Sequence, residues 1–128
     1  MANLPRRSHE RFPCDIPVAI HSAVTEAKIA EARFLDLSMG GTLVRVETLL
    51  QKRVPYQFRF SWENHRLRVM GRVAWEAERD PKNPAWHHYG ISLTLSTRQE
   101  EFFKRLIDRL RLENREERRD FMRDYWSL

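Results

Sequence analysis

The sequence predicts a mainly β protein: a small antiparallel six-stranded β-barrel with a flexible basic N-terminal arm and a C-terminal α-helix. Short runs of alternating apolar and polar residues, separated by turn-forming residues, recur between positions 16 and 95. After position 96 the apolar residues change to helical spacing. At 128 residues the chain is long enough for one hydrophobic core and too short for two.

Composition narrows the class of protein further. No apolar run is long enough to span a bilayer, and no apolar segment follows the basic N-terminus, so we expect a cytoplasmic protein with no membrane contact. The single Cys14 excludes an internal disulfide. The net charge is +5, and residues 98–124 are nearly balanced, so the positive excess lies in the arm and the β-rich body. That distribution favours an anionic ligand, although charge alone does not separate a nucleotide from nucleic acid.

The first half predicts an arm and three strands. Residues 1–12 are polar and basic, and Pro5 and Pro13 discourage a helix there. A first strand begins with residues 17–20, residues 28–35 alternate weakly, and residues 42–46 are β-branched and apolar. Asp36 to Gly41 forms the turn between the second and third strands.

The second half predicts three more strands. Aromatic residues occupy every second position of 56–62, and Glu63-Asn64 forms a hairpin into residues 66–75. Along 66–75, Leu67, Val69, Val73 and Trp75 share one side. Residues 78–85 contain two prolines and form a loop, and residues 88–95 supply the last strand.

A helix should cover the barrel. Ser96 and Gln99 fit a capping box at its start. Its apolar residues recur at helical spacing and should form a lid on the barrel: Phe102, Phe103, Leu106, Ile107 and Leu110.

Two polar clusters interrupt this pattern. Arg6, Arg7 and Arg11 lie in the arm, with the spacing R-x-x-x-R between the last two. The turn residues Asp36, Ser38 and Gly41 follow the order D-x-S-x-x-G. Each cluster alone has an ordinary explanation, a solvated arm or a turn. Their occurrence together favours ligand binding.

The two clusters resemble the motifs of the PilZ domain, a bacterial receptor for the second messenger cyclic di-GMP. The resemblance covers roughly residues 6–110, including Tyr89-Gly90-Ile91. It implies a PilZ domain at 1–112 (arm 1–12, barrel 16–95, helix 97–112) and a charged helical extension at 113–128. It also implies cyclic di-GMP as the ligand, with no other cofactor and no metal.

The resemblance assigns ligand contacts to Arg7, Arg11, Asp36, Ser38 and Gly41. Arg6 doubles the first arginine, an arrangement that in relatives goes with binding two intercalated ligand molecules. Trp75 stands where many relatives carry an aromatic residue near the ligand, although its alternation with Val73 fits the core equally well.

The chemistry of these residue types suits the ligand. A planar arginine fork can bind guanine O6 and N7 or two phosphate oxygens, and a carboxylate accepts from guanine N1 and N2. The expected mechanism is a switch, in which the ligand orders the arm and an effector protein reads the changed surface. We expect no enzyme, because the chain lacks a phosphate-binding glycine loop, a metal-ligand cluster and a nucleophile arrangement.

Two other functions remain open: an RNA- or DNA-binding β-barrel, and a protein-interaction adaptor that needs no ligand. The downstream process is not indicated, since motility, exopolysaccharide synthesis and biofilm formation are all compatible. His87 and His88 are strand neighbours on opposite faces, which disfavours a shared metal. Cys14 has no base partner in the pattern and should be inert.

A second apolar cluster lies near the C-terminus, beyond a charged stretch. We expect it to bind an effector protein, a second copy in a homodimer, or its own barrel: Phe121, Met122, Tyr125 and Trp126.

Overall fold

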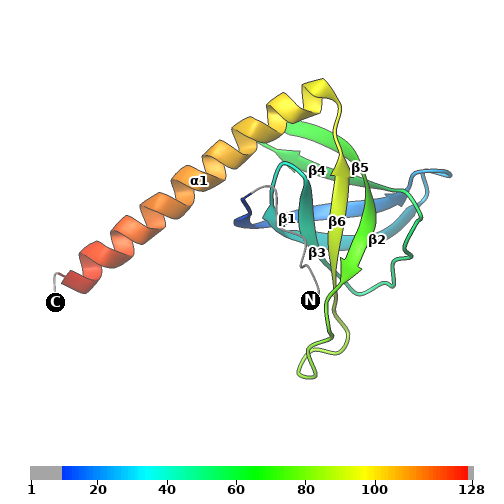
Figure 1. Ribbon diagram of the computed structural model, residues 1–128, viewed down its shortest axis with the longest axis horizontal. Helices are drawn as coiled ribbons and strands as arrows, with labels where there is room; N and C mark the ends of the chain where they lie inside the picture. Colours follow the sequence, from blue (N-terminus) through cyan, green and yellow to red (C-terminus); the bar gives the residue numbers. More distant parts are fainter. Residues whose placement is uncertain (1–9, 127–128) are drawn as a thin grey trace, which may run out of the picture.

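Six antiparallel strands close into one barrel, and a single long helix follows them (Figure 1). The computed structural model describes the backbone of residues 10–126 and the side chains of residues 10–114. The strands are β1 (Phe12–Ser22), β2 (Lys28–Leu37), β3 (Gly41–Val46), β4 (Tyr56–Trp62), β5 (His65–Glu76) and β6 (His87–Thr94). Around the barrel they follow the order β1-β2-β3-β6-β5-β4. The predicted fold class is therefore confirmed.

The barrel interior is filled by aromatic and β-branched side chains. Phe34 and Phe58 are fully buried, and Phe34 also meets the edge of Phe60 with ring centroids 5.1 Å apart. On β3 the alternation is strict: Val44 and Val46 are buried, while Leu43 and Arg45 point outward. The outer face of the strands is thus free to carry polar chemistry.

β1 begins at Phe12, four residues before the predicted start of the barrel. Phe12 is buried, and the guanidinium of Arg111 lies 5.2 Å from the centre of its ring. A register shift between Pro13 and Ile16 accommodates the proline within the strand. Residues 12–15, which lie before the predicted start of the barrel, therefore belong to its first strand.

The turn between β4 and β5 is the predicted hairpin. Glu63 and Asn64 both have positive φ, 45° and 65°, as the two central residues of a type I′ turn require. Trp62 pairs with His65 across it.

Trp75 does not lie on the side of β5 that its alternation with Val73 predicts. A register shift between Val73 and Trp75 places one extra residue, Ala74, opposite β6. Such a bulge reverses the facing of the residues that follow it. Val73 is accordingly buried, whereas Trp75 is 38% exposed on the outside of the barrel.

The helix α1 (Thr97–Trp126) begins at the predicted capping box. Ser96 Oγ accepts from the Gln99 amide at 3.2 Å, and Gln99 Oε1 accepts from the Ser96 amide at 3.0 Å. Of the predicted lid residues, Phe103, Leu106, Ile107 and Leu110 are buried. Phe102 is half-buried and meets the edge of Trp62, with ring centroids 5.5 Å apart.

The helix is continuous through the predicted extension and runs away from the barrel toward its C-terminal end (Figure 1). Its last buried side chain among residues 10–114 is Leu110. The cluster predicted to bind a partner (Phe121, Met122, Tyr125 and Trp126) lies on helical backbone, and its side chains are outside the described part.

Candidate functional site

Ser38 closes the turn between β2 and β3. Its Oγ accepts from the amides of Gly40 at 3.3 Å and Gly41 at 3.1 Å, and it donates to the Gly41 carbonyl at 3.2 Å. The side chain is 4% exposed. The hydroxyl is therefore engaged within the turn, where it fixes the backbone between the two strands.

Asp36 is held rigidly at a bulge of β2. The β2–β3 register shifts between Phe34 and Asp36, so that Asp36 pairs with Leu43 and points outward beside it. Its Oδ1 accepts from the Leu43 amide at 2.8 Å, and its own carbonyl accepts from the Thr42 hydroxyl at 2.7 Å. The carboxylate is thus oriented by the backbone of β3, with Oδ2 free for another partner.

Arg11 occupies that second oxygen. Its Nη1 lies 3.5 Å from Asp36 Oδ2, and both side chains are slightly more than four-fifths buried. The structure therefore brings together one arginine of the arm and the aspartate of the turn, 25 residues apart in the chain. Arg6 and Arg7, the other two predicted arginines, lie outside the described residues.

One row of outward positions crosses the sheet from Asp36 to Trp75. Asp36 pairs with Leu43 of β3, Leu43 with Gly90 of β6, and Gly90 with Trp75 of β5. Neighbouring strands are about 4.8 Å apart, so the row spans about 14 Å. The predicted aspartate and tryptophan thus share one outer face of the barrel.

Two glycines on this face permit close packing. A Cβ at Gly90 would collide with the indole of Trp75, so the ring lies directly on the β6 backbone. A Cβ at Gly41 would collide with the carbonyl oxygen of Ile91. Neither glycine has positive φ. Glycine is therefore required at position 41 by the close approach of β6, and not by an unusual turn conformation.

Two residues that the sequence pattern does not single out, Arg45 and Trp86, lie on the same face. Arg45 pairs with Arg33 on β2 and with His88 on β6, one outward row along from Leu43. The Arg45 guanidinium lies 4.8 Å from the centre of the Trp86 ring. The alternation of β3 after Gly41 could have identified Arg45 as outward-facing, whereas the loop before β6 gives no signal for Trp86.

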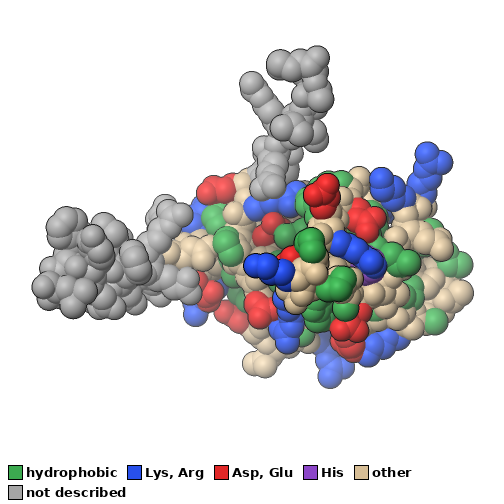
Figure 2. All heavy atoms as spheres, turned by 90° about the horizontal axis from the view of Figure 1, so that it is seen from below, with side chains coloured by type: hydrophobic (Ala, Val, Ile, Leu, Met, Phe, Trp, Pro, Cys, Tyr) green, Lys and Arg blue, Asp and Glu red, His purple; other side chains and the backbone are tan. Residues whose placement is uncertain are grey.

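Charged side chains of both signs are interspersed on the part of the molecular surface that Figure 2 shows. On the face shown in Figure 2, Lys and Arg side chains alternate with Asp and Glu and do not form one continuous basic stripe. Among the described residues, no group of three or more His, Cys, Asp or Glu side chains could hold a metal ion. Within residues 10–126, no helix combines the length and the hydropathy that crossing a bilayer requires.

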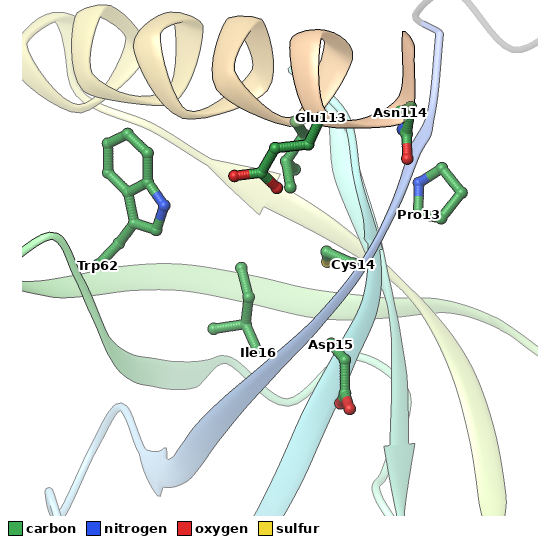
Figure 3. A pocket seen from close by; sticks show the side chains of 8 residues that line it. Pro13, Cys14, Asp15, Ile16, Trp62, Glu113 and Asn114 are labelled. Carbon is green, nitrogen blue, oxygen red and sulfur yellow. The ribbon is translucent and has the colours of Figure 1, made fainter. Parts of the chain in front are cut away.

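A separate pocket of about 430 Å³ lies between the start of β1 and α1 (Figure 3). The Trp62 ring lies at one end of the pocket, and the Glu113 carboxylate points from α1 into its middle, above Ile16. Cys14 also lines it, and its thiol donates to the Phe34 carbonyl at 3.5 Å. Of the predicted ligand-binding residues that the structure describes, none lines this pocket.

The Cys14 thiol has low reactivity, because its pKa is raised. Burial, reinforced by the nearby carboxylates of Asp36 and Asp15, raises its pKa from 9.0 to about 12. At neutral pH very little of the reactive thiolate is therefore present, which agrees with the prediction that Cys14 is inert.

Comparison with known proteins gives the fold a family. The sequence profile of the PilZ domain matches residues 5–109. A search of curated proteins found no significant sequence match.

Several solved structures share the fold. The PilZ domain of YcgR from Escherichia coli, solved with c-di-GMP, matches with a TM-score of 0.69 and 21% identity over 88% of this chain and 96% of that one. The PilZ domain of CeSA from a cellulose-synthesizing bacterium matches with a TM-score of 0.53 and 23% identity over 73% and 88% of the two chains. The MrkH–c-di-GMP complex of K. pneumonia matches with a TM-score of 0.73 and 12% identity, over 89% of this chain and 56% of that longer one.

The profile covers most of the chain, and it includes both the arm arginines and the turn that the barrel presents beside Arg11. This six-stranded barrel with its capping helix therefore belongs to the PilZ domain family.

Proposed function

We propose that this protein is a receptor that binds cyclic di-GMP on the outer face of β2, β3, β6 and β5 and relays its level to a partner protein. The observation that carries the proposal is the meeting of Arg11 and Asp36, at 3.5 Å, on the face that also carries Trp75. Family membership and the two c-di-GMP complexes among the similar structures support the choice of ligand.

Arg11 and Asp36 are paired weakly enough to be redirected by a ligand. The 3.5 Å between Arg11 Nη1 and Asp36 Oδ2 is at the long end for a hydrogen bond, so the two groups do not form a tight contact. Guanine offers both partners better geometry: O6 and N7 accept from the arginine fork, and N1 and N2 donate to the carboxylate. The pair thus holds both groups in position until the nucleotide binds.

The other site residues take roles that fit their surroundings. Arg6 and Arg7 would bind phosphates and the second guanine, and Trp75 would stack on a base, a contact of about 1–3 kcal/mol. Ser38 and Gly41 would act through the turn, because the hydroxyl of Ser38 is bonded inside it and Gly41 lies against β6. The ligand would leave unchanged, since the proposal assigns no residue to chemistry on it.

Calorimetric titration with cyclic di-GMP tests the proposal directly. We expect saturable binding by the wild-type protein and at least a tenfold loss of affinity in Arg11→Ala and in Asp36→Ala. Arg59→Ala on β4, outside the proposed face, is the matched control and should bind normally. Absence of binding by the wild-type protein, or normal binding by both site variants, contradicts the proposal.

Parallel titrations with short single-stranded RNA and DNA test the alternative function. A nucleic-acid barrel would bind these strands and retain binding after both substitutions. If the protein is a receptor for cyclic di-GMP, we expect no such binding at 150 mM salt.

The relay is the second part of the proposal. Each ordered residue costs about 1–2 kcal/mol of backbone entropy, so several charge-assisted bonds to the ligand are needed to fix the arm. Amide hydrogen exchange of residues 2–10 should slow on addition of cyclic di-GMP, while exchange in α1 stays the same. Unchanged exchange in the arm at saturating ligand rejects the relay and leaves the binding intact.

A further inference from the structure

Arg45, on the outer face of β3, has no ion-pair partner among the described residues. Arg33 and Arg45 are directly opposite on β2 and β3, an arrangement that is unfavourable for two like charges. Arg33 is compensated, because its Nη1 lies 3.0 Å from Asp15 Oδ1. Arg45 has no ion pair with any residue from 10 to 114.

The Arg45 side chain is nevertheless fixed in place. Its guanidinium lies over the Trp86 ring, 4.8 Å from the ring centre. Its Nε is covered and has no hydrogen-bond partner. Buried polar atoms are nearly always satisfied in native proteins, so an arginine held in this way calls for an explanation.

A second pair of opposed arginines, outside the proposed face, shows what ordinary compensation looks like. Arg59 and Arg68 oppose each other on β4 and β5. Arg59 Nε donates to Gln57 Oε1 at 2.6 Å, and Arg68 Nη1 lies 3.7 Å from Glu26 Oε1. Both members of that pair therefore have acceptors, in contrast to Arg45.

We propose that Arg45, supported by Trp86, is a further ligand-binding residue that receives a phosphate group of the nucleotide; this rests on the proposed function. The fork of a guanidinium matches two phosphate oxygens, and an aromatic ring beneath it restricts its orientation before binding. Arg45 is one outward row from Leu43, which separates Asp36 from Gly90 and Trp75. A ligand seated between Asp36 and Trp75 would thus have Arg45 along its edge.

Calorimetry on full-length variants tests this role. We expect Arg45→Gln to weaken cyclic di-GMP binding at least fivefold and to flatten the dependence of affinity on salt between 50 and 300 mM. Arg45→Lys keeps the charge without the fork and should lose less affinity than Arg45→Gln. Arg59→Gln, the matched control, should stay within twofold of wild type.

The outcomes separate the inference from the function on which it rests. If the wild type binds and Arg45→Gln stays within twofold, or if Arg45→Gln and Arg59→Gln weaken binding equally, the inference is wrong and the receptor function stands. If the wild type does not bind, the receptor function itself fails.

A second variant covers the case in which Arg45→Gln does not fold. Trp86→Leu keeps the guanidinium and removes its support, and we expect it to weaken binding about threefold or more. Affinity unchanged in that variant would also overturn the inference.

Discussion

At the scale of the residue, Gly90 shows how a position without a side chain can shape a site. The Trp75 indole lies where a Cβ of residue 90 would be. Gly90→Ala should therefore push the ring off β6, with a cost of about 1–3 kcal/mol in the free energy of unfolding. We expect a red shift of tryptophan emission and weaker binding of cyclic di-GMP.

A double-mutant cycle checks the reason for that effect. In a Trp75→Ala background the added methyl of Gly90→Ala meets no indole, so its cost should largely disappear. An equal cost in both backgrounds would mean that the methyl strains the backbone of β6 and does not displace the ring.

Cys14 gives a pH dependence of stability. Its pKa is raised by burial from 9.0, the ordinary value, to about 12 in the folded chain. The folded state therefore keeps the proton longer than the unfolded state, so this contribution is complete below pH 9 and is lost as the pH rises through 9 toward 12. Urea unfolding at pH 7.5 and pH 10 should show a fall in stability that Cys14→Ala reduces.

Tyr89 also contributes to the pH dependence of stability in that experiment. Burial also raises its pKa, so it contributes a loss of the same sign above pH 10. A pH dependence identical in wild type and Cys14→Ala would assign the whole effect to groups other than Cys14.

At the scale of the element, α1 divides at Leu110. Among the side chains described, up to residue 114, Leu110 is the last that is buried, while the helical backbone continues to Trp126. Removal of residues 113–128 should consequently shift the melting temperature by no more than a few degrees and change ligand affinity by no more than a few-fold. It should abolish any self-association through the C-terminal cluster, measured by light scattering.

Leu106→Ala is the contrasting variant, because it removes most of a fully buried side chain of α1 and leaves a cavity. It should cost about 2–5 kcal/mol. If truncation at residue 113 destabilises the barrel as much as Leu106→Ala does, the extension belongs to the core and not to an interaction surface.

The sequence predicts a strand correctly where the strand buries one face and its apolar residues alternate without interruption. β4 matched its predicted bounds, 56–62, because an aromatic residue occupies every second position. The alternation along β5 predicts the wrong face for Trp75, because a bulge inserts Ala74. The bulge depends on pairing with β6, which is a non-local property. Trp86 gave no signal, because its role depends on a neighbour that the fold supplies.

At the scale of the whole molecule, closure of the barrel explains why residues far apart in sequence share a site. Pairing of β2 with β3, β3 with β6 and β6 with β5 aligns Asp36 with Trp75, whereas the motif spacing by itself carries no information on distance. The order of the motifs could thus be read from the sequence. Their convergence required the register.

The remaining question at this scale is whether the arm binds by geometry or only by charge. Exchanging Arg7 and Ser8 (Arg7→Ser with Ser8→Arg) keeps composition and net charge and breaks the R-x-x-x-R spacing to Arg11. If arginine forks must reach defined acceptors, affinity for cyclic di-GMP should fall at least tenfold, measured by calorimetry at 150 mM salt. A diffuse positive field would be unaffected by the exchange. The urea midpoint should be the same in both proteins, because the exchange lies before Phe12, where the barrel begins. Equal affinity in the exchanged and wild-type proteins would reduce the arm to a source of charge and leave Asp36 and its neighbours on the barrel as the whole of the specific site.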